Sequence, residues 1–470
     1  MPRGRKGMVT IGFGSWSAMA KHLFGTDGIR GVAGEYPLDD ATVYAVGLAL
    51  ARHITARRSR DSTPPEVVVG MDTRESSRPL AELLAGGLEV GGVGVRFVDV
   101  LPTAGVAFLT EGGDFAAGVM ISASHNQFQD NGIKVFGSSG FKLPDAEEHE
   151  LETGIFRSLE QKPQPRRKPL TAEVTLAERY LQHVLGIVKP SRTLSRFRVV
   201  VDCANGAAFR FGPKLLESLN VAAEVIGNEP DGRNINLGCG SLHLERLQEK
   251  VFASKADLGI AFDGDADRAL FVADDGAIVD GDVVLLLAAG YLDQRNHLPG
   301  KLVVGTVMAN MGLEKALAEA GIELVRTAVG DKYVLEEMNR RGAALGGEQS
   351  GHVIFREYAT TGDGLVTGRM LLEVLAVSQK PLSELRRRLQ VFPQKLENIR
   401  VKQKTPFEQV PVLAEAVRGV ERELGDRGRV LVRYSGTEPL VRIMVEAQDP
   451  ADVERHTGRL ARIFRAELGA

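Results

Sequence analysis

The sequence predicts an α/β protein built from three similar units, followed by a smaller α+β unit at the C-terminal end. Three segments share one order: a short β-branched run, a glycine-rich turn, a stretch of helical periodicity and a second apolar run. This order is typical of buried parallel strands joined by helical crossovers. The chain has 470 residues, more than one ordinary core accommodates, so three or four domains are expected.

The three units are expected to contain the same elements in the same order. We expect the first strand, the helix and the second strand of each unit at 67–69, 77–90 and 93–98; at 199–201, 211–219 and 222–226; and at 302–304, a helix ending at 320, and 322–325.

A third strand in each unit leads into a polar loop. These strands are expected at 116–121, 258–262 and 343–345, and the loops that follow are SASHN, DGDADR and GGEQSGH. Ligands of open α/β sheets bind beyond the carboxyl ends of the strands. Three related units therefore each place one polar loop at the same position, which predicts one composite active site.

The character of the sequence changes after Pro381. Two strands, at 430–434 and 440–445, flank a turn, and a helix is expected at 452–468. This pattern indicates a smaller α+β domain. The stretch 161–169, rich in proline and lysine, is expected to be a loop near the first domain boundary.

Composition excludes several classes of protein. Hydrophobic residues make up 43% and charged residues 25%, and the net charge of −3 comes with scattered lysines and arginines, which argues against nucleic acid as a partner. No apolar run approaches the roughly 20 residues of a membrane span. Cys203 and Cys239 are too few for a disulfide framework or a zinc site, so we expect a reducing, cytoplasmic location. Residues 1–20 are expected to be a disordered extension, with Met19 as an alternative start.

Three aspartates at alternate positions form the candidate metal site. Asp263, Asp265 and Asp267 repel one another unless a hard divalent cation neutralises them, and Mg²⁺ suits few carboxylates combined with a phosphate oxygen. A calcium-binding EF-hand loop does not fit, because Gly264 is misplaced and Asp274 stands where a glutamate is needed. The alternative interpretation is an acidic surface turn.

Ser124 is the candidate nucleophile. It lies between a strand end and a run of turn-forming residues, with His125 or Lys134 available to move protons or to steady charge. The alternative is a serine that caps a helix through a local turn.

Two further loops offer binding groups for a phosphorylated ligand. Arg433, Ser435, Gly436 and Thr437 form a compact anion site, which the nearby Arg442 favours over a plain turn. In the third loop Glu348, Ser350 and His352 alternate, so an extended backbone would point all three in one direction, toward a sugar's hydroxyl and amino groups. An ordinary polar loop is the alternative there.

Of four other cationic residues, two are candidates for phosphate contact and two are expected to lie on the surface. Arg30, in the glycine-rich turn FGTDGIRG, and Lys332, after Gly330, are further candidates. Arg74 and Arg78 are expected to be surface residues beside the start of a helix.

Five motifs in this order resemble the alpha-D-phosphohexomutase family: FGTDGIRG, SASHN with DNGIK, DGDADR, GGEQSGH and RYSGTEP. The resemblance extends from about residue 21 to the C-terminus. It implies four domains around a central cleft, three of which share a mixed α/β fold, with domains at 21–176, 177–280, 281–392 and 393–470. One departure is Gln127, where the family usually has proline, and this loosens the turn without removing a chemical group.

The resemblance also implies the chemistry. Gln349 and the FGTDGIRG opening favour members that convert glucosamine 6-phosphate to glucosamine 1-phosphate, on the route to UDP-N-acetylglucosamine. Ser124 matches the phosphoserine, which joins Asp263, Asp265 and Asp267 in holding one Mg²⁺. Arg30 and Lys134 match residues next to the phosphoserine. Glu348 and Ser350 match residues that contact the sugar, and His352 lies in the same loop. The phosphate that is not reacting is bound, in the family, at positions that match Arg433, Ser435, Gly436 and Thr437.

Several alternatives stay open at the level of sequence. One is a family member that prefers mannose or glucose phosphates, since such relatives commonly carry methionine at the position of Gln349. Another is a non-catalytic phosphosugar-binding protein, and a third is a phosphatase. The partner expected in each case is a small phosphosugar, without nucleic acid or membrane, and a homodimer is compatible with the sequence.

Overall fold

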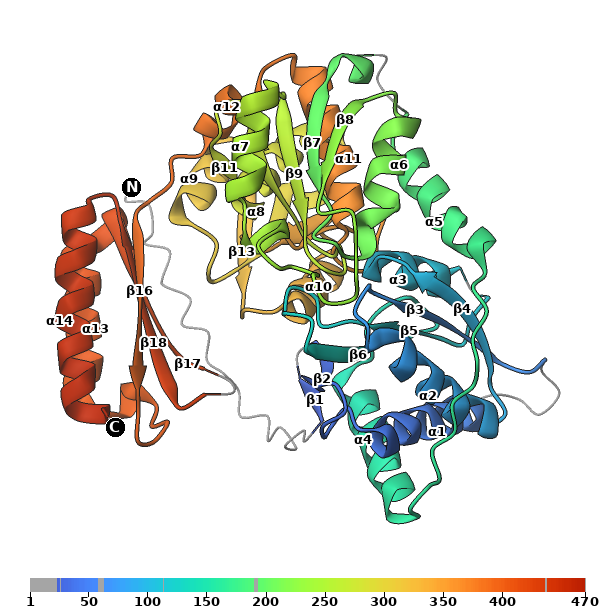
Figure 1. Cartoon of the computed structure of the whole chain (residues 1–470). Coiled ribbons are helices and arrows are strands. Elements are labelled where there is room, and N and C mark those ends of the chain that lie inside the picture. Colours follow the sequence, from blue (N-terminus) through green and yellow to red (C-terminus); the bar gives the residue numbers. More distant parts are fainter. Residues whose placement is uncertain are drawn as a thin grey trace.

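Four β-sheets, each covered by helices, make up the described part of the chain (Figure 1). The computed structural model describes residues 23–25, 27–57, 63–112, 114–189, 193–435 and 438–469. We call each sheet with its helices a unit and number the units in chain order. The expected extension at 1–20 lies outside the described residues. No described helix has the length and apolar character needed to cross a bilayer.

The first unit has the strand order β1-β2-β6-β5-β3-β4. Strand β3 is parallel to β4 and β5, whereas β6 is antiparallel to β5 and β2. The elements of this unit are β1 (Phe24–Gly25), β2 (Gly28–Val32), α1 (Asp40–Ala56), β3 (Glu66–Met71), α2 (Ser77–Val90), β4 (Gly94–Val100), α3 (Thr103–Glu111), β5 (Ala117–Ile121), β6 (Asp130–Gly137) and α4 (Asp145–Glu160).

The second unit has the strand order β11-β10-β9-β7-β8. Strand β7 is parallel to β8 and β9, and β10 is antiparallel to β9. Its elements are α5 (Val174–Gly186), η1 (Leu194–Arg196), β7 (Arg198–Asp202), η2 (Ala207–Phe209), α6 (Phe211–Ser218), β8 (Ala222–Ile226), η3 (Gly240–Leu242), α7 (Glu245–Ser254), β9 (Leu258–Phe262), β10 (Ala269–Ala273) and β11 (Ile278–Val279).

The third unit has the strand order β13-β12-β14-β15, again with the last strand antiparallel to its neighbour. Its elements are α8 (Gly281–Asp293), η4 (Pro299–Lys301), β12 (Leu302–Thr306), α9 (Met311–Glu319), β13 (Glu323–Thr327), α10 (Asp331–Arg341), β14 (Leu345–Gly347), β15 (Val353–Phe355), α11 (Gly364–Ser378), α12 (Leu382–Leu385) and η5 (Arg386–Arg388).

The fourth unit is a smaller antiparallel sheet of order β16-β18-β17. Helices α13 and α14 pack on it and close a core of their own (Figure 1). Its elements are β16 (Gln394–Arg400), η6 (Phe407–Gln409), α13 (Pro411–Leu424), η7 (Gly425–Arg427), β17 (Gly428–Tyr434), β18 (Leu440–Ala447) and α14 (Pro450–Leu468).

The predicted repeat of the first three units is confirmed. The expected strands and helices fall on β3, α2 and β4, on β7, α6 and β8, and on β12, α9 and β13, and each third strand is present as β5, β9 or β14. The residue patterns did not predict the antiparallel strand that follows in each unit. Because of β6, β10 and β15, each polar loop connects two adjacent antiparallel strands, which holds it at the end of its sheet.

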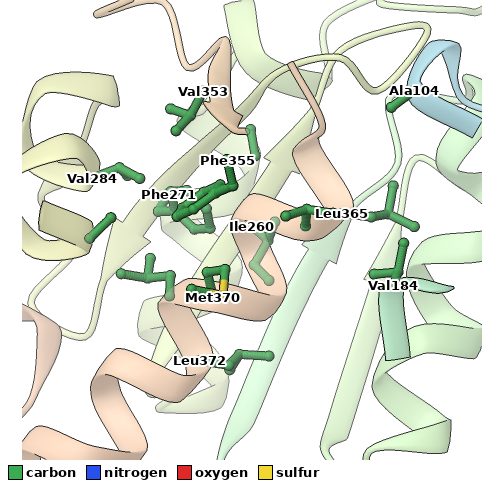
Figure 2. Close-up of a cluster of buried hydrophobic side chains, with 14 of the residues drawn as sticks. Ala104, Val184, Ile260, Phe271, Val284, Val353, Phe355, Leu365, Met370 and Leu372 are labelled. Atoms are coloured by element: carbon green, nitrogen blue, oxygen red, sulfur yellow. The ribbon is translucent and has the colours of Figure 1, made fainter. Parts of the chain in front are cut away.

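One continuous hydrophobic core joins the first three units. Successive residues of β3 point to opposite faces, so Val68 belongs to this shared core while Val67 and Val69 face a second core with α1 and α2. Figure 2 shows Phe271 of β10 and Met370 of α11 gathered in the shared core. Packing therefore fixes the first three units relative to one another.

The fourth unit is attached to the third by a compact polar joint. Arg429 of β17 donates to the backbone oxygens of Val307 and Ala309 at 2.9 and 2.7 Å and pairs with Glu446 of β18. Glu446 is fully buried and accepts from the N–H of Met311, the first residue of α9, at 2.9 Å. The fourth unit thus meets its neighbour through charged hydrogen bonds and has a separate apolar core.

We predict that Phe271→Ala lowers the free energy of unfolding of the shared core by about 3–5 kcal/mol, because a fully buried ring leaves a cavity. Chemical denaturation followed by circular dichroism measures the change. Phe252→Ala is the matched control, since that ring is 77% exposed, and its effect should stay within about 0.5 kcal/mol. Equal effects of the two substitutions would contradict this account of the core.

Candidate active site

Ser124 lies in the loop between β5 and β6, and its hydroxyl points at the second unit. Ser124 Oγ donates to Asp263 Oδ2 at 2.5 Å. His125 Nδ1 lies 3.3 Å from Ser124 Oγ. The residue is 1% exposed and has a φ of 53°, a left-handed conformation that costs free energy for a residue other than glycine. The loop thus holds this hydroxyl in a strained geometry that brings it to the aspartates.

The predicted aspartate site is formed. Asp263, Asp265 and Asp267 are buried in the loop between β9 and β10, and one oxygen of each lies within 4.8 Å of the others. Burial, together with Asp267 and Asp265, raises the pKa of Asp263 well above its usual value. Three carboxylates in this arrangement need positive charge among them.

The donor set fits Mg²⁺. Asp265 Oδ1 and Asp267 Oδ1 are buried oxygens without a hydrogen-bond partner among the described residues. Hard carboxylate oxygens are the ligands that Mg²⁺ prefers. The interpretation as an acidic surface turn is wrong, because Asp263 and Asp265 are fully buried and Asp267 is 4% exposed.

Glycine at position 264 lets the first two loops meet backbone to backbone. A Cβ atom there would lie 2.4 Å from the carbonyl oxygen of Ser124, closer than any side chain can come. A larger residue would therefore push the nucleophile loop away from the aspartates.

Lys134 supplies positive charge on one side of the aspartates. Its Nζ lies 2.9 Å from Asp265 Oδ2, 3.2 Å from Asp267 Oδ2 and 3.1 Å from Asp27 Oδ2. Burial alone would lower the pKa of Lys134, but these carboxylates hold it well above its usual value. Lys134 and Ser124 are therefore linked through the aspartate site. Lys134 pairs with Asp265 and Asp267, while Ser124 donates to Asp263.

Further charged contacts connect the first unit to the third unit, and the third unit to the aspartate loop of the second. Lys142 Nζ lies 2.5 Å from both Asp27 Oδ1 and Asp331 Oδ2. His352 Nε2 is 3.8 Å from Asp331 Oδ2, and His352 Nδ1 is 3.8 Å from Asp267 Oδ1. Charged and polar groups from three units thus surround the site.

His125 and Arg30 lie beside the same charged cluster, His125 next to Ser124 and Arg30 next to Asp27. Burial, then Arg268 and Arg30, lowers the pKa of His125 to about 4, so its imidazole is uncharged at neutral pH. Arg30 donates to Asp27, the carboxylate that Lys134 also binds. His125 can accept a proton, while Arg30 contributes fixed positive charge.

The third loop does not have the predicted extended form. The N–H of Gly351 donates to the carbonyl oxygen of Glu348 at 3.0 Å, and this closes a turn in which Gly351 has a φ of 91°. The turn sends the side chains apart: Ser350 is exposed, whereas His352 is buried and its Nε2 accepts from the N–H of Gly362 at 3.0 Å. Glu348 is partly buried and accepts from the N–H of Gly330.

The predicted anion site is in the fourth unit, at the end of β17. Arg433 and Arg442 are directly opposite each other on β17 and β18, and burial, then Arg442, lowers the pKa of Arg433. Within the described residues Arg433 has no ion-pair or hydrogen-bond partner, so its charge is available to an anion. Gly436 and Thr437 lie outside the described residues. No described hydrogen bond or ion pair connects Arg433 or Ser435 to the aspartate site.

The prediction that Arg74 is a surface residue is wrong. Arg74 is 2% exposed, pairs with the buried carboxylate of Asp72, and donates to the backbone oxygens of Ser124 and Asn126 at 3.1 and 2.6 Å. Its position two residues after an aspartate at the end of β3 was the available signal. Arg78 is exposed, as expected.

Models of the four domains of phosphoglucomutase/phosphomannomutase match residues 21–162, 178–276, 280–392 and 396–463. The chain belongs to the phosphoglucomutase/phosphomannomutase family. This confirms the resemblance carried by the five motifs and the α/β fold with a smaller C-terminal domain. The finer boundaries at 176, 280 and 392 stay predictions.

Two similar proteins share nearly the full length of the chain. A protein named phosphoglucosamine mutase from Solibacter usitatus (strain Ellin6076) is 53% identical over 451 residues, which cover 96% of this chain and all of the relative. One of the same name from Koribacter versatilis (strain Ellin345) is 49% identical, covering 96% of this chain and 98% of the relative.

Solved structures of the family have the same fold. A phosphoglucomutase/phosphomannomutase family protein from Burkholderia thailandensis is 27% identical with a TM-score of 0.78, covering 95% of this chain and 99% of that one. N-acetylphosphoglucosamine mutase of Aspergillus fumigatus, solved in complex with GlcNAc-6P and magnesium, is 17% identical with a TM-score of 0.64, covering 95% and 96%.

We predict that Asp265→Asn weakens Mg²⁺ binding at least about tenfold, because the site loses both a ligand and a negative charge. Isothermal titration calorimetry with MgCl₂ measures the affinity. Asp275→Asn is the control, since that carboxylate lies in the turn between β10 and β11 and pairs with Arg386. Unchanged Mg²⁺ affinity in Asp265→Asn would show that the ion binds elsewhere.

Proposed function

We propose that this family member is an isomerase that converts glucosamine 6-phosphate to glucosamine 1-phosphate. The reaction proceeds through phosphorylated Ser124 and a bound glucosamine 1,6-bisphosphate. The observation that carries the proposal is the contact of Ser124 Oγ with a buried aspartate of the metal-type site. The names of the relatives that are 49–53% identical supply the sugar.

Ser124 and the three aspartates form the reacting centre. Asp263, Asp265 and Asp267, with an oxygen of the phosphorylated Ser124, are the residues that would hold one Mg²⁺. When bound, the ion offsets negative charge on the transferring phosphoryl group, the dominant effect in such reactions. Lys134, already paired with two of the aspartates, is placed to steady the same charge from the protein side.

The transfer exchanges one phosphorus–oxygen bond for another. The bond from phosphorus to Ser124 Oγ breaks while a free hydroxyl oxygen of the monophosphate bonds to phosphorus. The sugar hydroxyl gives up its proton in this step, and Ser124 Oγ takes up a proton and becomes a free hydroxyl. His125 is uncharged at neutral pH and its Nδ1 lies 3.3 Å from Ser124 Oγ, so it is placed to accept the serine proton when Ser124 attacks the bisphosphate in the reverse transfer. After the bisphosphate turns over, the reverse transfer restores phosphorylated Ser124 and releases the isomer.

The remaining groups bind the sugar and the idle phosphate. We assign Glu348 and Ser350 to the sugar, whereas His352, predicted with them, is buried in the same loop between Gly362 and Asp267. We assign Arg433, Ser435, Gly436 and Thr437 to the phosphate that does not react. Since no described contact joins Arg433 to the aspartate site, we expect the fourth unit to close when the phosphosugar binds. The joint at Arg429 and Glu446 is its attachment, and closure would keep water from the phosphoserine. The cytoplasmic location and the homodimer compatible with the sequence stay predictions.

We predict that Ser124→Ala abolishes isomerisation while glucosamine 6-phosphate still binds, because the substitution removes the phosphoryl carrier and leaves the phosphate-binding groups. A coupled assay measures turnover, and calorimetry measures binding. Ser139→Ala, at an exposed serine beyond β6, is the control and should behave like the wild type. Near-normal activity of Ser124→Ala would refute the covalent route.

Substrate preference is tested on three hexose phosphates side by side. We expect kcat/KM for glucosamine 6-phosphate to exceed the values for glucose 6-phosphate and mannose 6-phosphate by at least about tenfold, a difference that a few hydrogen bonds to the amino group can supply. A higher value for either of the other sugars would assign the protein to a different branch of the family. Faster release of inorganic phosphate than isomerisation would indicate a phosphatase.

A further inference from the structure

The backbone of the Ser124 loop is held by two side chains from different units. Arg74 Nη2, from the first unit, donates to the carbonyl oxygens of Ser124 and Asn126 at 3.1 and 2.6 Å. Asn236 Nδ2, from the second unit, donates to the same two oxygens at 3.0 and 2.9 Å. Both hydrogens of the Asn236 amide are therefore used on this loop.

These hydrogen bonds hold a conformation that the loop would not adopt freely. Ser124 is left-handed, with a φ of 53°, and a serine has no intrinsic preference for that region. A conformation of this kind persists only where surrounding contacts over-determine it. Four donated hydrogen bonds on two carbonyl oxygens, in a region 1–6% exposed at Ser124, Arg74 and Asn236, provide such contacts.

Asn236 also links the Ser124 loop to the aspartate loop. A Cβ atom at Gly264 would lie 2.8 Å from Asn236 Nδ2 and 2.4 Å from the carbonyl oxygen of Ser124, so the three groups are in close contact. The N–H of Asn236 donates to the carbonyl oxygen of Ala204 at 2.9 Å, which fixes the asparagine to its own unit. The position of Ser124 relative to the aspartates thus depends on this amide.

We propose that Asn236 is a positioning residue for Ser124, acting from the second unit together with Arg74 in the first. It keeps Ser124 Oγ directed at Asp263 while the phosphoryl group leaves the serine and returns. Asn236 touches neither the phosphoryl group nor the sugar in this role. The inference rests on the proposed function, because it concerns the orientation of the Ser124 side chain in that reaction.

The test is Asn236→Gly, which removes the amide and still accommodates the φ of 57° at that position. We expect turnover per phosphorylated molecule, counted by intact-mass measurement, to fall about tenfold to hundredfold, as misplacement of a reacting group by about 1 Å does. KM for glucosamine 6-phosphate should stay within about twofold, since no group that binds the sugar or its idle phosphate is removed. A merely structural role would lower the folded fraction and leave turnover per phosphorylated molecule unchanged.

Asn220→Gly is the matched control. Asn220 belongs to the same unit, has a φ of 56° and is exposed, and its backbone N–H donates to the carbonyl oxygen of Glu217. It should keep wild-type turnover. Asn236→Asp is a second variant that keeps the side-chain shape but faces the two carbonyl oxygens with a carboxylate, and we expect it to lose at least as much turnover as Asn236→Gly.

The outcomes separate the two proposals. Wild-type turnover per phosphorylated molecule in Asn236→Gly, or in Asn236→Asp if the glycine variant does not fold, would overturn the positioning role and leave the proposed function intact. Failure of the wild-type protein to isomerise glucosamine 6-phosphate would overturn the proposed function and this inference with it.

Discussion

Mutual repulsion among three buried carboxylates is the constraint on which the rest of the site depends. Asp263, Asp265 and Asp267 lie close together in the protein interior, where unpaired charge is costly. Lys134 neutralises part of this charge, while Asp265 Oδ1 and Asp267 Oδ1 have no hydrogen-bond partner among the described residues. The negative charge that remains accounts for both the affinity for a divalent cation and the placement of a serine hydroxyl beside Asp263.

The repeated fold explains how groups far apart in the chain meet there. Each of the first three units places a loop between its third parallel strand and an antiparallel neighbour, and a common core keeps these units fixed. The loops therefore approach as closely as backbones allow, which is why residue 264 has to be glycine. The fourth unit has its own core and a polar joint, so Arg433, which we propose binds phosphate, lies in a part of the protein that is packed separately from the other three units.

Much of this arrangement could be predicted from sequence, because β-branched runs and glycine-rich turns are local signals. The strands and helices of the three repeats, the aspartate loop and Ser124 are such cases. Contacts between units leave no local pattern, so the sequence does not predict the burial of Arg74 or the hydrogen bonds from Asn236 to the Ser124 loop. Alternation at Glu348, Ser350 and His352 was misleading, since Gly351 allows a tight turn where an extended loop was expected. The residue patterns also do not predict that β6, β10 and β15 are antiparallel to their neighbours, because pairing direction is set by the whole sheet and not by local sequence.

A crystal structure with Mn²⁺ in place of Mg²⁺ and a bound phosphosugar tests the central claim most directly, because anomalous scattering locates the metal. We predict one metal ion ligated by Asp263, Asp265 and Asp267 and by an oxygen on Ser124, with the sugar's reacting hydroxyl facing that serine. A metal ion bound away from the three aspartates, or a phosphosugar whose hydroxyls all lie far from Ser124, would contradict the account.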